Sequence, residues 1–143
     1  MSSTTTSVPI TQELYYLLHL DGKVNAVSAV DRGLATTAFE RVAASLGISE
    51  RHLAELLRIK PSTLARRKRE GSLAVDESER LYRIAFLLER SIQVMGDLDA
   101  ARRWLQTSKR GLDGKSPLVF ARTEPGAREV EDLLGRVEYG LPS

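Results

Sequence analysis

The chain has 143 residues, a formal net charge of +2 and a hydrophobic content of 42%, which predicts a folded protein and not a disordered one. No apolar run approaches the roughly 18 to 20 residues that a membrane helix needs. The absence of cysteine excludes disulfides and thiolate chemistry and fits a reducing cytoplasm. The first nine residues are rich in Ser and Thr and lack the features of a secretory signal, so we expect a flexible tail.

Strand-type alternation of apolar and polar residues is scarce, so we predict an all-α fold whose helices are separated by glycine and proline. A short helix is expected over residues 12–20, ending near Gly22. A second is expected over residues 36–46, where apolar residues recur at helical spacing. Gly47 follows it at the position that favours the end of a helix.

The next segment has the pattern of a helix–turn–helix. Ser49 is a suitable N-cap for the first helix, and the turn is expected at residues 58–60. Pro61 then occupies the first position of the second helix, where its missing N–H costs nothing. Leu64 is expected to point inward, and Gly71 to end the helix. The apolar face of the first helix is Leu53, Ala54, Leu56 and Leu57.

Positive charge is concentrated on this predicted helix pair. Residues 51–69 contain seven Lys or Arg and one acid, Glu55; since the whole chain has a net charge of +2, the remaining residues sum to −4. A local cationic patch on two helices is the electrostatic signature of a DNA-binding element. The alternative is a solvated basic helix face, which is what many charge runs are.

In a helix–turn–helix the second helix enters the major groove and presents its outward side chains to base edges. With Leu64 inward, Arg66 lies outward and is predicted to contact a guanine, a contact that discriminates by about 1–3 kcal/mol. Useful affinity requires two copies on a two-fold-symmetric site, so we expect a homodimer. Phosphate contacts are predicted for Lys60, Arg67, Lys68 and Arg69, and either kind of contact for Ser62 and Thr63.

A longer helix is expected after the basic pair. Asp76 followed by Glu79 approximates a capping box at its start. Asp97 or Asp99 then begins a short helix, and residues 111–117 form a loop. The apolar stripe of the long helix is Leu81, Ile84, Ala85, Leu88, Ile92 and Met95, and the inward residues of the short one are Ala101, Trp104 and Leu105.

Pro125 marks the start of the last helix. Its apolar face is Val130, Leu133, Leu134 and Val137. The final residues, 139–143, contain Gly and Pro and cannot continue the helix, so a protruding C-terminus is expected. From the residues alone, such an end is either a frayed terminus or a short segment that binds a partner at little cost in entropy.

Nothing in the sequence satisfies the requirements of a catalytic or metal site. The two histidines, His19 and His52, lie far apart in the chain, and there is no cysteine, no HExxH motif and no glycine-rich phosphate loop. We therefore predict a binding protein that is not an enzyme and needs no cofactor.

Several short motifs occur in an order that resembles the Xre/MbcA/ParS-type antitoxins of bacterial type II toxin–antitoxin systems. The resemblance covers roughly residues 35–143 and depends on the motifs together. They are Thr63-Leu64-Ala65-Arg66-Arg67; Gly71-x-Leu73; Glu77-Ser78-x-Arg80-Leu81; Ala101 with Trp104-Leu105; Leu112-x-Gly114-x-x-Pro117-Leu118; and Gly126-x-x-x-Val130-x-x-x-Leu134 before Glu138-Tyr139-Gly140.

The resemblance implies an all-α antitoxin with a Cro-like N-terminal helix–turn–helix and a C-terminal toxin-binding domain. It implies dimerisation or a toxin–antitoxin hetero-oligomer, binding to operator DNA of its own operon, and inhibition of a RES-domain toxin that attacks NAD. In that family the C-terminal end enters the active-site cleft of the toxin. The matching positions here are Tyr139, Gly140, Leu141, Pro142 and Ser143, with the helix over residues 127–137 as the docking platform.

The domain organisation expected on these grounds has three parts: an N-terminal tail and short helix (1–30), the helix–turn–helix region (31–74) and the toxin-binding domain with its protruding C-terminus (75–143). A stand-alone dimeric helix–turn–helix regulator without a toxin partner is the alternative function. The two functions differ in what the C-terminal end does, because only the antitoxin requires it.

Overall fold

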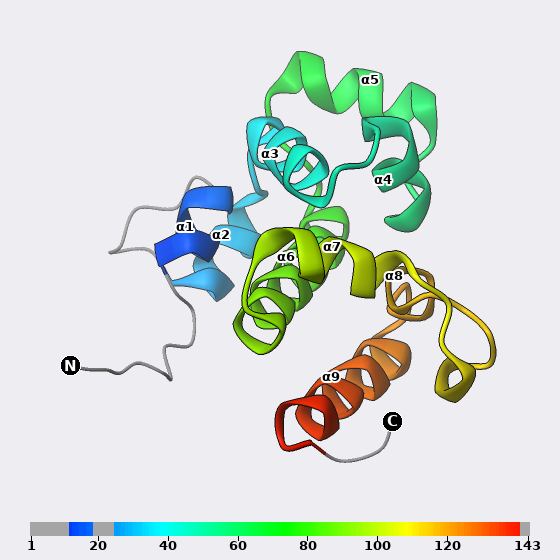
Figure 1. Cartoon of the computed structure of the whole chain (residues 1–143). Helices are drawn as coiled ribbons and strands as arrows, with labels where there is room; N and C mark the ends of the chain where they lie inside the picture. Colours follow the sequence, from blue (N-terminus) through cyan, green and yellow to red (C-terminus); the bar gives the residue numbers. More distant parts are fainter. Residues whose placement is uncertain (1–11, 19–24, 141–143) are drawn as a thin grey trace.

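The computed structural model describes residues 12–18 and 25–140, which form helices without any strand apart from one isolated bridge between Ala35 and Ser72 (Figure 1). The predicted all-α class is confirmed. The elements are α1 (Gln12–Leu18), α2 (Ala26–Arg32), α3 (Thr36–Leu46), α4 (Glu50–Leu56), α5 (Pro61–Glu70), α6 (Val75–Met95), α7 (Leu98–Gln106), a 3-10 turn η1 (Arg110–Leu112), α8 (Pro117–Phe120) and α9 (Glu124–Glu138).

The long helix α6 is the centre of the molecule. It packs against α1, α2, α3, α7 and α9, and Figure 1 shows it running between the helix–turn–helix region and α9. Its predicted apolar stripe is confirmed: Leu81, Ile84, Ala85 and Leu88 are buried, and Ile92 and Met95 pack half-buried against the same core. Residues from α1 to α9 therefore share one hydrophobic core, and no separate core exists for each half of the described chain.

The predicted capping box of α6 was placed two residues too late. The helix begins at Val75, with Ala74 as its N-cap, and Glu77 bends back so that its Oε1 accepts the backbone N–H of Ala74 at 2.9 Å. Asp76 instead pairs with Arg80 one turn further on, at 3.6 Å. The cause is a tertiary contact: Arg67 of α5 donates to the carboxylate of Glu77 and holds it at the start of α6.

Two short helices, α2 and α8, were not predicted. Asn25 caps α2 by accepting the N–H of Ser28 at 2.9 Å, and Ser116 caps α8 by accepting that of Val119 at 3.3 Å. Both have cap residues that the sequence displays, but each is too short for its apolar spacing to be distinguished from a loop. The predicted end of the first helix near Gly22 lies outside the described residues.

Side chains of α7 cap the C-terminal end of α3. Arg102 donates from Nε to the carbonyl of Ser45 at 2.7 Å, and Gln106 donates to the carbonyl of Leu46 at 3.0 Å. The last carbonyls of a helix have no partner within it, so these bonds replace water at the end of α3. Asp97, and not Asp99, is the N-cap that starts α7, with the N–H of Ala100 at 2.8 Å from its carboxylate.

No helix in the described parts of the chain combines the length and the apolar character that crossing a bilayer would require.

Candidate functional site

The predicted helix–turn–helix is formed by α4 and α5. Ser49 caps α4 by accepting the N–H of His52 at 3.0 Å, and Pro61 is the first residue of α5, as predicted. In the turn, Leu57 and Ile59 are buried and anchor the pair to the core, whereas Arg58 is exposed with a φ of 59°. The two helices therefore have a fixed relative position, and the outer face of α5 is free to meet a partner.

The outer face of α5 carries most of the predicted DNA-binding residues. Lys60, Ser62, Arg66 and Arg69 are exposed and Thr63 is half-buried. Leu64 packs against the core on the opposite side, as predicted. Within the described residues the three cations of this group have no carboxylate partner. Their side chains are thus available to bases and phosphates.

Arg67 has a different position from that expected of a phosphate contact. Its guanidinium donates two hydrogen bonds to the carboxylate of Glu77 on α6, with Nε 2.7 Å from Oε1 and Nη2 3.2 Å from Oε2. Its Nη1 also lies 3.4 Å from Oε1 of Glu70. The Glu77 side chain is buried and also caps Ala74, so one carboxylate joins the end of α5 to the start of α6. Arg67 thereby occupies the inward position where an apolar residue is common in such units.

Stability should depend on pH through Glu77. Burial alone would raise the pKa of this carboxyl, but the hydrogen bonds from Arg67 and Ala74 and the charge of Arg67 outweigh burial, so its pKa is lowered. A lowered pKa contributes stability above the unfolded value of about 4.3, and this is lost as the pH falls further. We expect Glu77→Gln to reduce the loss of melting temperature between neutral and acidic pH, as measured by circular dichroism.

The matched control is Glu79→Gln, which changes the same charge on an exposed side chain of α6. It should leave the acidic slope of the melting temperature like that of the wild-type chain. Equal slopes for the wild type and Glu77→Gln would contradict the assigned role of Glu77.

Lys68 is also paired with carboxylates of neighbouring helices, although its side chain is exposed. Its ammonium bonds to Glu50 at the start of α4 and lies 3.3 Å from Glu40 on α3. The hydrogen bond to Glu50 raises the pKa of Lys68, so the group stays charged. Lys68 and Arg67 therefore connect α5 to its neighbours. The cations of residues 51–69 that have no carboxylate partner among the described residues are Arg51, Arg58, Lys60, Arg66 and Arg69.

The predicted docking helix α9 begins at a close contact with α8. Thr123 caps it by accepting the N–H of Gly126 at 3.2 Å. A Cβ added at Gly126 would lie 1.8 Å from the backbone oxygen of Phe120, so only glycine permits the two helices to approach this closely. The predicted apolar face packs on α6, with Val130, Leu133 and Leu134 buried and Val137 half-buried.

An ion pair holds the far end of α9 against α6. Arg90 donates from Nη2 to Oε1 of Glu138 at 2.6 Å, and this bond lowers the pKa of the Glu138 carboxyl. Tyr139 follows with its side chain 79% exposed, and Gly140 turns the chain out of the helix with a φ of 73°. The helix end thus has an ion pair to α6, and the aromatic side chain that follows it lies in solvent. Leu141, Pro142 and Ser143, also predicted to bind a toxin, lie outside the described residues.

A surface groove of about 520 Å³ runs between α6 and α9. Half-buried Tyr82 and Phe86 contribute to it, with ring centroids 6.3 Å apart. The sequence does not predict this groove, because it forms only where two helices distant in the chain lie together. Trp104, by contrast, is half-buried in the core as expected, with Lys109 placed 5.0 Å over its ring.

Comparisons with known proteins match two successive segments of the chain to two domain families. Residues 26–85 match the family model of the antitoxin Xre-like helix–turn–helix domain. Residues 91–140 match that of the antitoxin Xre/MbcA/ParS C-terminal toxin-binding domain. These matches define the class of the protein: an antitoxin that combines a helix–turn–helix domain with a C-terminal toxin-binding domain.

The chain belongs to the Xre/MbcA/ParS family of antitoxins, which confirms the resemblance seen in its motifs. It is 37% identical over 81 residues to an antitoxin Xre of Yersinia enterocolitica (56% of this chain, 55% of the relative). To an antitoxin Xre of Photorhabdus laumondii it is 35% identical over 75 residues (52% and 51%). The chain spans about half the length of these curated relatives. A Prs ADP-ribosylating antitoxin of Sphingobium sp. is 24% identical over 136 residues, which are 88% of this chain and 86% of the relative.

Proposed function

We propose that this chain is an antitoxin that neutralises a RES-domain toxin acting on NAD and represses its own operon. The C-terminal end, residues 139–143, enters the active site of the toxin and blocks substrate entry, with α9 as the docking platform. The observation that carries this proposal is the match of residues 91–140 to a toxin-binding domain. Its support from the structure is the ion pair of Arg90 with Glu138 at the end of α9, directly before the exposed Tyr139.

Residues 31–74 act as the DNA-binding region and residues 75–143 as the toxin-binding region, with residues 1–30 as an N-terminal extension. A homodimer or a toxin–antitoxin hetero-oligomer places two copies of α5 on a two-fold-symmetric operator, because one helix pair offers few phosphate contacts. The reducing cytoplasm, where operator DNA and NAD are both found, is the compartment in which this protein acts.

The test is to express the toxin gene that neighbours this one, with and without the chain, and to measure cellular NAD. Preserved NAD with the chain present supports neutralisation. NAD that falls equally in both cultures would reject it and leave a stand-alone regulator. The reaction of the toxin is measured in the same samples. The Sphingobium relative is named a Prs ADP-ribosylating antitoxin, which gives a reason to include ADP-ribosylation beside NAD hydrolysis and phosphorolysis.

DNA binding has a separate prediction that compares two exposed cations of the helix pair. Arg66→Ala should relax sequence preference by about 1–3 kcal/mol, because the lost contact is to a base edge. Lys60→Ala should weaken binding to all sequences alike and lower the salt slope of log K by about one unit. The measurement is fluorescence anisotropy on promoter and random duplexes at several salt concentrations. Equal losses on both duplexes for both variants would reject base reading by Arg66.

Lys68→Ala is an informative third variant, because Lys68 is paired with Glu40 and Glu50 in the structure. We expect a lower melting temperature with little change in the salt slope. A decrease of one unit in the salt slope of log K would instead show that Lys68 contacts a phosphate, as predicted from the sequence.

A further inference from the structure

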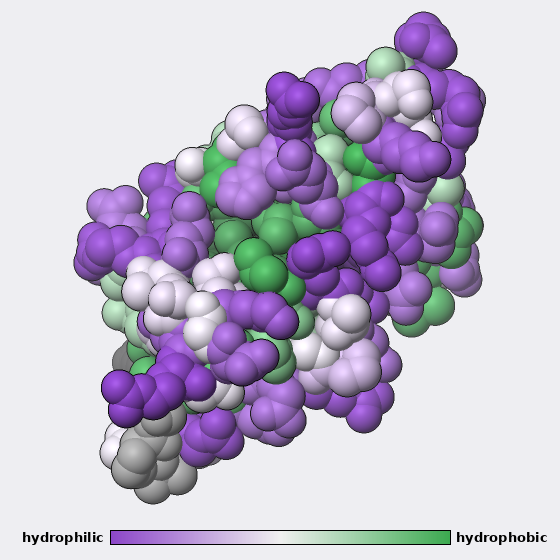
Figure 2. All heavy atoms as spheres, turned by 90° about the vertical axis from the view of Figure 1, so that its right-hand side faces the viewer, coloured by the Kyte–Doolittle hydropathy of each residue, from purple (hydrophilic) through white to green (hydrophobic). Residues whose placement is uncertain are grey.

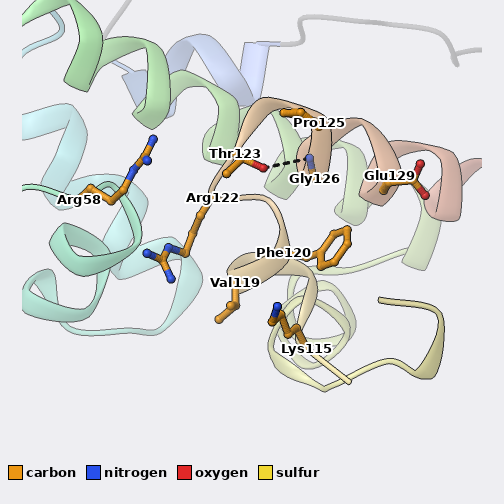
Figure 3. Close-up of a pocket in the computed structure, with 9 residues that line it drawn as sticks. All are labelled: Arg58, Lys115, Val119, Phe120, Arg122, Thr123, Pro125, Gly126 and Glu129. Carbon is orange, nitrogen blue, oxygen red and sulfur yellow. Dashed lines mark hydrogen bonds between the residues drawn. The ribbon is translucent and has the colours of Figure 1, made fainter. Parts of the chain in front are cut away.

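A second pocket, of about 420 Å³, lies where the helix–turn–helix meets the C-terminal helices (Figure 3). Its lining residues come from the turn after α4 and from the segments around α8 and the start of α9, which lie on the right-hand side of Figure 1, the side that faces the viewer in Figure 2. Hydrophilic residues cover most of that face, around a smaller apolar patch near its middle. The lining residues are Arg58, Lys115, Val119, Phe120, Arg122, Thr123, Pro125, Gly126 and Glu129.

The pocket is cationic, and its cations come from separate parts of the chain. Arg58 belongs to the helix–turn–helix turn, Lys115 precedes α8, and Arg122 connects α8 to α9. All three are exposed, and none forms an ion pair with a carboxylate of the described residues. Glu129 is the one acidic lining residue, and Figure 3 shows it on the far side of the pocket from Arg58 and Arg122. The local excess of positive charge is therefore uncompensated.

The backbone conformation of Arg58 is an independent reason to infer a functional role for its side chain. Arg58 has a φ of 59°, in the left-handed region that favours glycine, where other residues cost of order 1 kcal/mol. Glycine would occupy this turn without strain, yet the turn carries an arginine that lines the same pocket as Arg122 (Figure 3). Three cationic side chains that line one pocket favour the binding of an anion there.

The start of α9 offers few donors to a small anion. Pro125 has no N–H, and the N–H of Gly126 is already bonded to Oγ1 of Thr123 at 3.2 Å. Recognition must then come from the long cationic side chains, beside the exposed Val119 and the half-buried Phe120. A bare phosphate makes no use of that apolar wall. A carboxylate side chain with an apolar neighbour in the same peptide uses both.

We propose that this pocket, which we call the junction pocket, binds an acidic segment of the toxin through Arg58, Lys115 and Arg122, with an apolar side chain of the same segment against Val119 and Phe120. The proposal rests on the proposed antitoxin function and adds a second contact surface away from the C-terminal end. Because Arg58 lies in the helix–turn–helix, the bound toxin touches both family-matched regions at once.

The test uses the full chain and a catalytically inactive variant of the neighbouring toxin, with the dissociation constant measured by biolayer interferometry at low and near-physiological salt. Arg58→Gly with Arg122→Gln is the key variant, because glycine relieves the backbone strain and the fold should persist. We expect toxin affinity to fall about tenfold or more, with a weaker dependence on salt, since charge-assisted contacts are lost. Arg58→Lys with Arg122→Lys keeps the charge and should retain most of the affinity.

The matched control is Arg103→Gln with Arg110→Gln, which removes two exposed positive charges outside the junction pocket. It should change toxin affinity less than twofold. Equal toxin affinity for the wild type and the key variant would overturn the proposal while leaving the antitoxin function intact. Loss of operator binding without loss of toxin binding would also overturn it, by assigning the pocket to DNA phosphates. A wild-type chain that fails to bind the toxin at all would reject both the pocket and the proposed function.

Discussion

Gly126→Ala should destabilise the protein by about 2–4 kcal/mol in the free energy of unfolding. The added Cβ would lie 1.8 Å from the backbone oxygen of Phe120 and 2.9 Å from its carbonyl carbon, so backbone and not a flexible side chain would have to move. The α8–α9 contact would open, and the cap that Thr123 provides at the start of α9 would be disturbed. Urea denaturation followed by circular dichroism measures the change.

The same substitution at Gly135 should have the opposite sign. Gly135 lies inside α9, and a Cβ there would have no atom within 4 Å. Alanine should therefore stabilise the helix by about 0.5–1 kcal/mol through its better helix propensity. If Gly126→Ala also stabilised the protein, helix propensity, and not the contact with Phe120, would decide the response at Gly126.

Stopping the chain after Glu138 should abolish toxin neutralisation and leave promoter binding nearly unchanged. Tyr139 is 79% exposed, so its removal opens no cavity in the core, and Arg90 keeps Glu138 as its partner. The loss is therefore expected in the complex and not in the fold. The measurement is cellular NAD after induction of the neighbouring toxin gene, together with a gel shift on promoter DNA.

Two further chains make this result specific. A chain that ends at Gly140 tests residues 141–143 alone, and full-length Tyr139→Ala tests the exposed aromatic ring. If the chain stopped after Glu138 preserves NAD as well as the full chain does, inhibition must come from the helical surface, such as the α6–α9 groove or the junction pocket. The C-terminal end would then have no part in inhibition.

The sequence predicted best those features that depend on neighbours in the chain. The boundaries of α4 and α5 follow from Ser49, Pro61 and Gly71, which act through caps and a missing N–H. The apolar stripe of α6 was also predicted correctly, because its apolar spacing persists over many turns.

Features that depend on partners distant in the fold were not predictable. In the sequence, Arg67 is one cation among several, and only the fold brings it to Glu77. The Glu77 carboxylate also accepts the N–H of Ala74, so α6 begins earlier than predicted. The junction pocket likewise unites Arg58 with Arg122, which lie on different helical regions. The local charge of a segment therefore indicated a kind of partner, but not which cations remain unpaired.

The bonds from Arg102 and Gln106 to the last carbonyls of α3 have a consequence for how the protein is removed from the cell. Unfolding the C-terminal helices would strip the partners from the end of α3, and unfolding α3 would expose the core that α6 shares with α9. We therefore expect a protease that engages either half to degrade the whole chain in one step. Repression and neutralisation would then end together, with no surviving fragment that still occupies the operator.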